Sequence, residues 1–182
     1  MKLSRIVGVL SDEVKVYKEQ EGEKFLQRNI CIGRKTVPIV YSEFLGMPAE
    51  GKVNISGYLR TELNGETFFH FFFVIDASQA AEDSPIGSHM HIEGVIQRVD
   101  QKQFSKRGAE ILPVVIRYVT WDDNTNVIHA TIANAHARRF GSLNIVPRET
   151  EIEAIGHIKT RRRYIEVALD EIIKVGGEDF VR

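Results

Sequence analysis

The stretch TFFHFFF at 67–73 is the most aromatic segment of this chain, because five phenylalanines fall within six positions. A β-strand turns successive side chains to opposite faces, so a strand here would carry rings on both faces. One set of rings can fill a core. The other set is available to stack on a flat ligand or to pack on another protein surface.

Aromatic and basic residues also alternate elsewhere in the chain. Tyr58 precedes Arg60 by two positions, and His157 precedes Lys159 by two, so each pair would share one face of a strand. Rings stack on unpaired nucleobases, which contributes about 1–3 kcal/mol per base, and Arg and Lys bind phosphates. The pattern therefore predicts contacts with single-stranded nucleic acid. The run Arg161-Arg162-Arg163-Tyr164 fits the same use, although three arginines also fit a solvated hairpin tip.

An internal repeat supplies the elements that must position these residues. Two matches share an offset of 86, namely IVGVL (6–10) with IEGVI (92–96) and Gly22 with Gly108. Further along, NISGYLRT (54–61) matches EAIGHIKT (153–160) at an offset of 99, and FFVIDAS (72–78) matches EVALDEI (166–172) at an offset of 94. Because all four recur in the same order, the sequence predicts two copies of one fold.

Each copy is expected to form five strands, because β-branched runs alternate with hairpin signals at Asn64-Gly65 and Lys106-Arg107-Gly108. The expected strands lie near 3–18, 23–34, 36–42, 51–62 and 66–76, then near 90–105, 110–120, 126–133, 150–160 and 163–175. A short helix is expected at 133–141, between strands three and four of the second copy, where the first copy has only SEFLG (42–46). This is the pattern of the OB-fold, a small Greek-key barrel. The predicted fold is all-β, with tandem OB-folds at 1–80 and 91–182 and a linker at 81–90.

The repeat also allows one copy to assign the faces of the other. In the last strand of the second copy the alternating apolar residues are the core face, namely Ile165, Val167 and Leu169. Transferred at the offset of 94, this register predicts Phe71, Phe73 and Ile75 inward, and Phe68, His70, Phe72 and Val74 outward. Outward rings fit either a platform for bases or an interface with another subunit.

Further candidates lie in the hairpins between strands one and two, which commonly line an OB groove. Trp121 would stack on a base, although large aromatic residues also pack in cores and interfaces. Arg117 is assigned to the outward side of its strand. The complete set of candidate nucleic-acid-binding residues is Tyr17, Lys18, Tyr58, Arg60, Phe68, Phe72, Phe104, Lys106, Arg107, Arg117, Trp121, His157, Lys159, Arg161, Arg163 and Tyr164.

Composition narrows the class of protein. With 182 residues, 43% of them hydrophobic, and no run of about 18 apolar residues, the chain is expected to be globular and not to span a membrane. Its N-terminal stretch reaches charged residues too early for a secretory signal, and its single cysteine, Cys31, fits a reducing cytoplasm. The net charge is −1, but residues 97–163 carry an excess of Lys and Arg, which fits a polyanion partner or an ordinary solvated surface.

No cofactor, metal or catalytic site is expected. His89 and His91 lie two positions apart, without a cysteine or a third ligand at useful spacing. The sequence contains no glycine-rich phosphate loop, no H-E-x-x-H and no nucleophile elbow, so an enzyme is not expected.

Three segments carry a family resemblance: IVGVL, GKVNISGYLRTELNGETFFHFFFVIDAS (51–78) and GHIKTRRRYIEVALDEIIKV (156–175). They resemble the first, fourth and fifth strands of bacterial single-stranded DNA-binding proteins, including a G-x-L-x-T core, and the related primosomal replication protein B has the same fold. The resemblance implies OB-folds, binding of single-stranded DNA with little sequence preference, and four-barrel particles, which a two-barrel chain would reach as a homodimer. The chain ends GGEDFVR, where that family has an acidic tail ending in Phe, so recruitment of partners through such a tail is not expected.

The expected function is therefore binding of single-stranded DNA, which protects or organises it during replication or recombination, including that of a phage or mobile element. The alternative is an OB-fold interaction module that docks on a replication helicase or primase. Added salt distinguishes the two, because phosphate binding weakens steeply with salt and an apolar interface does not.

Overall fold

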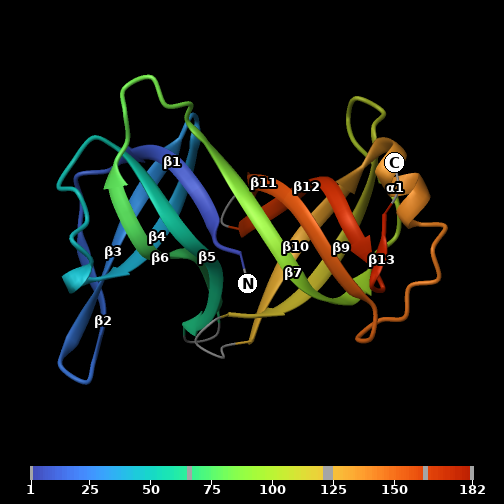
Figure 1. Cartoon of the computed structure of the whole chain (residues 1–182), viewed down its shortest axis with the longest axis horizontal. Coiled ribbons are helices and arrows are strands. Elements are labelled where there is room, and N and C mark those ends of the chain that lie inside the picture. Colours follow the sequence, from blue (N-terminus) through green and yellow to red (C-terminus); the bar gives the residue numbers. More distant parts are fainter. Residues whose placement is uncertain (1, 65–66, 121–124, 162–163, 181–182) are drawn as a thin grey trace. The chain divides into compact units, whose positions relative to one another are not determined.

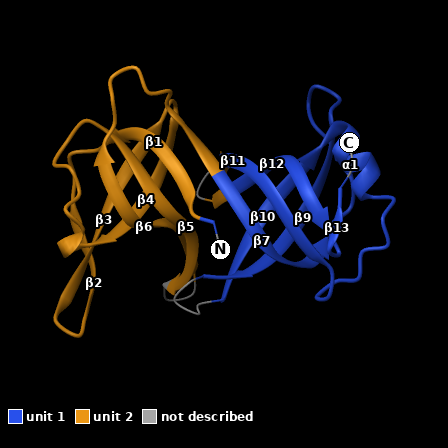
Figure 2. Cartoon of the chain, in the orientation of Figure 1, with its two compact units in different colours: residues 1–2, 90–159, 166–182 blue, residues 3–89, 160–165 orange. Residues whose placement is uncertain are grey.

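The computed structural model describes residues 2–64, 67–120, 125–161 and 164–180, except for the side chains of Asn64 and Arg161 (Figure 1). Strands dominate, which confirms the all-β prediction. The chain forms two compact units (Figure 2). The first barrel is built from Leu3–His89 with Thr160–Ile165, and the second barrel mainly from Met90–Lys159 and the segment from Glu166 onward.

The first barrel follows the expected order of elements. They are β1 (Ser4–Leu10), β2 (Lys15–Gln20), β3 (Glu23–Ile32), β4 (Lys35–Ser42), the single 3-10 turn η1 (Glu43–Leu45), β5 (Lys52–Asn64) and β6 (Thr67–Gln79). Neighbouring strands run in the order β2-β3-β4-β6-β5-β1, with β4 parallel to β6, and β1 closes the sheet by also pairing with β3. Because β1 and β2 both pair with β3, together they act as the long first strand of an OB-fold.

The second barrel repeats this arrangement. Its elements are β7 (Gly87–Val99), β8 (Gln103–Phe104), β9 (Glu110–Val119), β10 (Thr125–Ala133), α1 (Asn134–Phe140), β11 (Glu151–Arg161), β12 (Tyr164–Val175) and β13 (Glu178–Asp179). The order is β8-β9-β10-β12-β11-β7, β10 is parallel to β12, and β7 pairs with β9. The repeated Greek key confirms the prediction of tandem OB-folds. Strand β7 starts within the segment 81–90 that the sequence assigned to a linker.

The helix expected at 133–141 is present as α1. Its buried residues, Ala137 and Phe140, close one end of the second barrel's core, whereas the first barrel has only η1 at the equivalent place. Neither α1 nor any other helix in the described part of the chain is long and apolar enough to cross a membrane.

The glycine of the repeated first-strand motif allows a close approach to the neighbouring strand in both barrels. A Cβ on Gly8 would lie 2.6 Å from the carbonyl oxygen of Cys31, and a Cβ on Gly94 would lie 2.4 Å from that of Arg117. Only a residue without a side chain allows β1 and β7 to approach the neighbouring strand this closely. The two contacts also confirm the offset of 86, because Cys31 and Arg117 are 86 positions apart.

The last strands align at an offset of 95, one more than predicted. A Cβ on Gly57 would lie 1.9 Å from the carbonyl oxygen of Phe73, and one on Gly156 would lie 2.2 Å from that of Ala168. Phe73 is therefore equivalent to Ala168, and the predicted offset of 94 is wrong over this part of the strand. The predicted offset of 99 for β5 and β11 is confirmed by the same two glycines.

This shift reverses the faces predicted for the middle of β6. Phe72 and Val74 were predicted outward, but both lie in the core, with 0% and 2% of their surface exposed. Phe73 and Ile75 were predicted inward and are only half-buried. The physical reason is a bulge, since the β5–β6 ladder skips Ile75, and one extra residue moves every side chain beyond it to the other face.

The alternating apolar residues of the two fourth strands lie inward. Their exposed fractions lie between 0% and 7%, for Val53, Ile55, Leu59, Ile152, Ala154 and Ile158. The alternate positions therefore face outward, and these include Arg60, His157 and Lys159. Tyr58 lies on the same outer face, but only 3% of its surface is exposed, and its ring stacks on Phe73.

Candidate nucleic-acid interface

A cluster of aromatic rings covers the outer face of β5 and β6 in the first barrel. We call it the ring cluster, and its members are Tyr17, Phe25, Tyr58, Phe69, Phe71 and Phe73. Neighbouring ring centroids are 5.3 to 6.0 Å apart, and the Phe69–Phe71 and Tyr58–Phe73 pairs are stacked. Such distances are typical of favourable aromatic contacts.

The register of β5 and β6 brings these rings together. Tyr58 lies opposite Phe73, Arg60 opposite Phe71, and Glu62 opposite Phe69, so the odd-numbered positions of β6 share the outer face with the even-numbered positions of β5. Phe71 is fully buried on this face, because Tyr17 packs over it at 5.4 Å.

Tyr17 reaches the ring cluster through an irregularity in the β2–β3 hairpin. Val16 pairs with Leu26 and Lys18 pairs with Phe25, so Tyr17 is an extra residue that the ladder leaves without a cross-strand counterpart. A bulge of this kind redirects a side chain and bends the strand. Here it turns the Tyr17 ring onto Phe69 and Phe71.

Two cations lie on these rings. The Lys18 ammonium is 5.4 Å from the centroid of the Phe25 ring and 5.9 Å from that of Tyr17, and the Arg60 guanidinium is 5.5 Å from that of Phe73. Each contact contributes about 0.5–1 kcal/mol at an exposed site. The first barrel thus presents rings and positive charge on one outer face.

Glu62 holds these groups together. It accepts a hydrogen bond from the Tyr17 hydroxyl at 2.7 Å and forms ion pairs with Arg60 at 2.9 Å and Lys18 at 3.5 Å. Burial raises the pKa of the Tyr17 phenol above its ordinary value, and the hydrogen bond to the Glu62 carboxylate raises it further. The carboxylate therefore occupies a position where an incoming phosphate would meet the same two cations.

The second barrel has a more open, polar outer face. Arg117 is exposed and lies opposite Val127, and His129 is exposed and lies opposite Glu166. Lys159 is exposed on β11.

The remaining candidates of the second barrel lie in two places, on β11 and in the β8–β9 hairpin. His157 forms an ion pair with Asp170 through Nδ1 at 2.8 Å, with 43% of its side chain exposed. Phe104 is 69% exposed in β8, and Lys106 and Arg107 are exposed in the turn that follows it. This hairpin therefore presents one ring and two cations to solvent.

Three aromatic candidates from the last strands have different positions. Phe68 is 67% exposed, whereas Phe72 fills the core and has no outer surface to offer. Tyr164 is 58% exposed, and its ring makes an edge contact with His70 at 6.0 Å. Trp121 and Arg163 lie outside the described residues, as does the side chain of Arg161.

Sequence reasoning missed five members of this face, namely Phe25, Phe69, Phe71, Phe73 and Glu62. Phe25 lies three positions after the repeat glycine Gly22, and Glu62 continues the Tyr58–Arg60 alternation, so both signals were present in the sequence. Phe73 was missed because the bulge at Ile75 could not be placed from a single sequence.

Comparison with known proteins shows the fold of the whole chain. No family model and no curated protein sequence matches it. The single-stranded DNA-binding protein from Thermus aquaticus superposes with a TM-score of 0.74 at 12% identity, and the match covers 100% of this chain and 94% of that one. A deletion mutant of the same Thermus protein superposes with a TM-score of 0.75, also at 12% identity, over 100% and 95% of the two chains.

The dimeric N-terminal domain of PriB from Thermoanaerobacter tencongensis is 27% identical over 44% of this chain and 98% of that one, with a TM-score of 0.39, which is too low to carry an argument. The Thermus likeness shows the fold alone at its low identity. It confirms that the resemblance to single-stranded DNA-binding proteins extends to tertiary structure across both barrels.

Proposed function

We propose that this chain binds single-stranded DNA with little sequence preference, and that bases stack on aromatic side chains while Lys and Arg hold the phosphates. The observation that supports this most directly is the placement of Lys18 and Arg60 over half-buried rings on one outer face of an OB-fold. Every base has a ring face, so stacking tolerates any sequence. The proposed role is stoichiometric protection of the strand during replication or recombination, with no catalytic step.

The second barrel would extend the bound strand along a mainly phosphate-holding surface. Its exposed basic residues, Arg117 and Lys159, lie on strands equivalent to those that carry the ring cluster. We further propose that the chain acts as a homodimer, so that four OB-folds share one length of DNA.

One observation supports the alternative of a protein-interaction module. Leu63 and Phe68 lie directly opposite each other in the β5–β6 hairpin, with 65% and 67% of their surface exposed. A pair of exposed apolar side chains of this size is typical of a docking surface. In that case the partner would be a replication protein such as a helicase or primase.

Fluorescence anisotropy of a labelled poly-dT oligonucleotide, measured at low and moderate salt, tests the proposal. We expect tight binding to the single strand, weak binding to a duplex, and a linear loss of log affinity with log salt concentration. No binding to the single strand at low salt would contradict the proposal and leave the docking alternative.

A ring variant tests the mechanism. Phe25→Ala removes a half-buried ring beneath Lys18, and we expect a loss of about 1–3 kcal/mol in binding. The matched control is Phe44→Ala in η1, whose ring is 77% exposed and lies outside the ring cluster. Equal losses in both variants would argue against specific stacking.

A further inference from the structure

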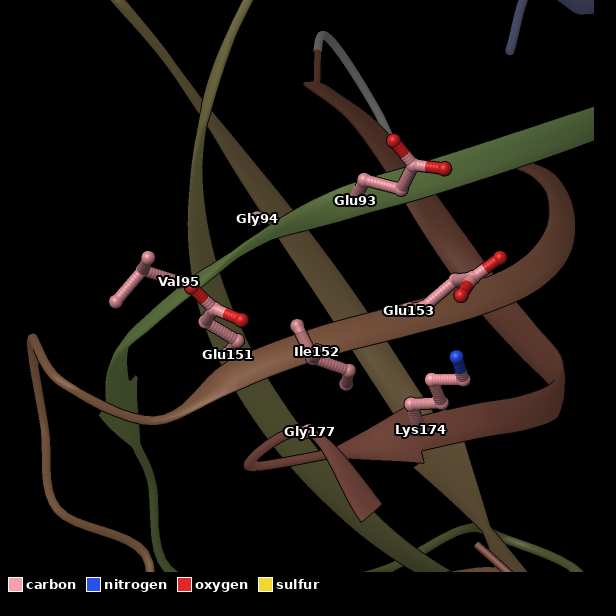
Figure 3. Close-up of a pocket in the computed structure, with 8 residues that line it drawn as sticks. All are labelled: Glu93, Gly94, Val95, Glu151, Ile152, Glu153, Lys174 and Gly177. Atoms are coloured by element: carbon pink, nitrogen blue, oxygen red, sulfur yellow. The ribbon is translucent and has the colours of Figure 1, made fainter. Parts of the chain in front are cut away.

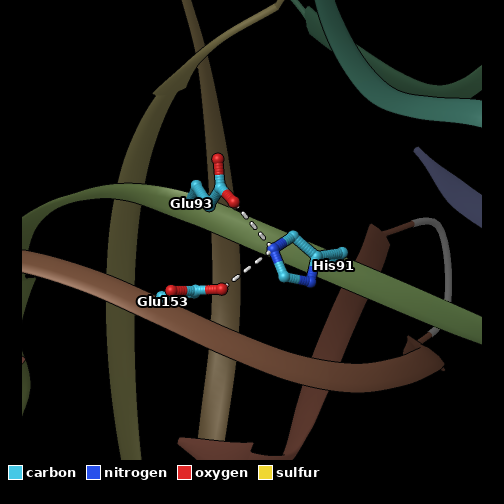
Figure 4. Close-up of side chains that lie close together, drawn as sticks. All are labelled: His91, Glu93 and Glu153. Carbon is cyan, nitrogen blue, oxygen red and sulfur yellow. Dashed lines mark hydrogen bonds and ion pairs between the residues drawn. The ribbon is translucent and has the colours of Figure 1, made fainter. Parts of the chain in front are cut away.

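Three side chains of the second barrel converge on one point. The Nε2 atom of His91 lies 2.9 Å from an oxygen of Glu93 and 3.5 Å from an oxygen of Glu153 (Figure 4). The three ligand-capable atoms all lie within 4.8 Å of one another. His91 and Glu93 are on β7, and Glu153 is on the neighbouring strand β11.

The backbone register explains this convergence and shows its electrostatic cost. Glu93 pairs directly with Glu153 across the antiparallel β7–β11 ladder, and His91 is two positions from Glu93 on the same face. Like charges directly opposite each other destabilise a strand pair. A cation between the two carboxylates would remove that repulsion.

Burial and access also suit a bound ion. Only 5% of the His91 side chain is exposed, so the imidazole is held at the site, whereas Glu93 remains 40% exposed. Glu93 and Glu153 also line a hollow of about 340 Å³, together with Glu151 and Lys174 (Figure 3). The hollow leaves room for water ligands beside the two carboxylates.

We propose that His91, Glu93 and Glu153 bind a divalent transition-metal ion, with Zn²⁺ bound more tightly than Mn²⁺ and Mg²⁺ bound weakly. One imidazole and two carboxylates are a common donor set for Zn²⁺, and water completes the coordination. Metal–ligand bonds of about 2.0–2.2 Å at tetrahedral angles separate the ligand atoms by about 3.3–3.6 Å, close to the His91–Glu153 distance. Imidazole favours Zn²⁺ over Mg²⁺, which prefers oxygen ligands.

The bound ion would link strand β7 to strand β11 through their side chains. It must compete with the Lys2 ammonium, which forms an ion pair with Glu153 at 3.2 Å. Removal of the Lys2 charge should strengthen binding.

Titration calorimetry with ZnCl2, MnCl2 and MgCl2 on the full chain tests the site. We expect one Zn²⁺ per chain and a rise of several degrees in the thermal unfolding midpoint with excess Zn²⁺. Co²⁺, added as a spectroscopic probe, should give visible absorption bands typical of mixed nitrogen and oxygen ligands.

Variants assign the ligands. Loss of an outer-shell partner typically lowers metal affinity about 10–100-fold. His91→Ala removes a direct ligand, so it should lower Zn²⁺ affinity by more than that. Glu153→Gln keeps the shape of the side chain and should also lower affinity, whereas Lys2→Gln should raise it. The matched control is His89→Ala, two positions away and exposed, which should bind Zn²⁺ as the wild type does.

Two results would overturn the site. One is the absence of heat, midpoint shift and Co²⁺ bands with the wild-type chain. The other is binding that His91→Ala and Glu153→Gln leave unchanged, since the ion would then lie elsewhere. Circular dichroism of each variant shows that lost binding does not reflect lost fold.

Discussion

The two barrels share one strand order and differ in what stands on their outer faces. In the first, Phe71 packs against Tyr17 and Phe73 stacks on Tyr58. In the second, Glu166 and Ala168 stand at the positions of Phe71 and Phe73, at an offset of 95. His157 stands at the position of Tyr58, at an offset of 99. One strand order therefore carries two chemically different outer faces, because the residue types on each copy differ.

Charge differs between the faces in the same way. Glu62 in the first barrel pairs with both Arg60 and Lys18 and so neutralises its own cations. At the offset of 99, the residue corresponding to Glu62 is Arg161. Under the proposed function, the first barrel would mainly stack bases and the second would mainly hold phosphates.

The largest expected effect tests the register that underlies the comparison. Phe72→Ala should destabilise the first barrel by about 3–5 kcal/mol, because a fully buried ring leaves a cavity. Phe68→Ala, at a ring that is 67% exposed, should change stability by no more than about 0.5 kcal/mol. Urea unfolding followed by circular dichroism measures both. A harmless Phe72→Ala would restore the outward assignment of this ring.

The phosphate-holding role of the second barrel is tested by Arg117→Ala combined with Lys159→Ala. Because two phosphate contacts would be lost, the slope of log affinity against log salt should become shallower by about 1.4, and low-salt affinity should fall at least about tenfold. Poly-dT anisotropy over a salt series measures this. Arg34→Ala, in the exposed turn between β3 and β4, is the control for loss of one charge. An unchanged slope in the double variant would remove the second barrel from the interface.

A smaller effect is expected from Glu62→Gln in the first barrel. Removing this carboxylate releases Arg60 and Lys18 to phosphates, so affinity for poly-dT should rise about three- to tenfold at low salt. The gain should shrink as salt increases, because salt screens exposed charges. Glu50→Gln makes the same charge change at an exposed loop position and should have less effect. A loss of affinity would mean that Glu62 orders the face for binding.

The smallest effect concerns alkaline stability. The pKa of Tyr17 is raised in the folded protein, so its neutral form is favoured by folding. This contribution is fully present below the unfolded pKa of about 10 and is lost as pH rises above it. Tyr17→Phe should therefore lose less thermal stability between about pH 8 and about pH 11 than the wild type. Because burial also raises the pKa of Tyr41, part of the alkaline loss should remain. Identical losses in variant and wild type would show that Tyr17 ionises as freely in the folded chain as in the unfolded one.

Much of the fold could be predicted because its signals are local. Alternation identified the inward residues of β5 and β11, and paired glycines located the first strands. A length difference between the copies predicted a helix in the second barrel and almost none in the first, and the structure has α1 in the second and only the short turn η1 in the first. These features depend on neighbouring residues along one strand or turn, so the amino-acid sequence by itself determined them.

The tertiary structure decided the features that depend on two strands at once. The bulge at Ile75 arises from the pairing of β5 with β6, and it placed Phe72 in the core and Phe73 outside. The bulge at Tyr17 depends on the β2–β3 ladder.

The cluster of His91 with Glu93 lacked a visible third member in the sequence, because Glu153 is 60 positions away from Glu93 and becomes its neighbour only through β-pairing. Register is a relation between strands, and a one-residue change in it reverses every side chain that follows.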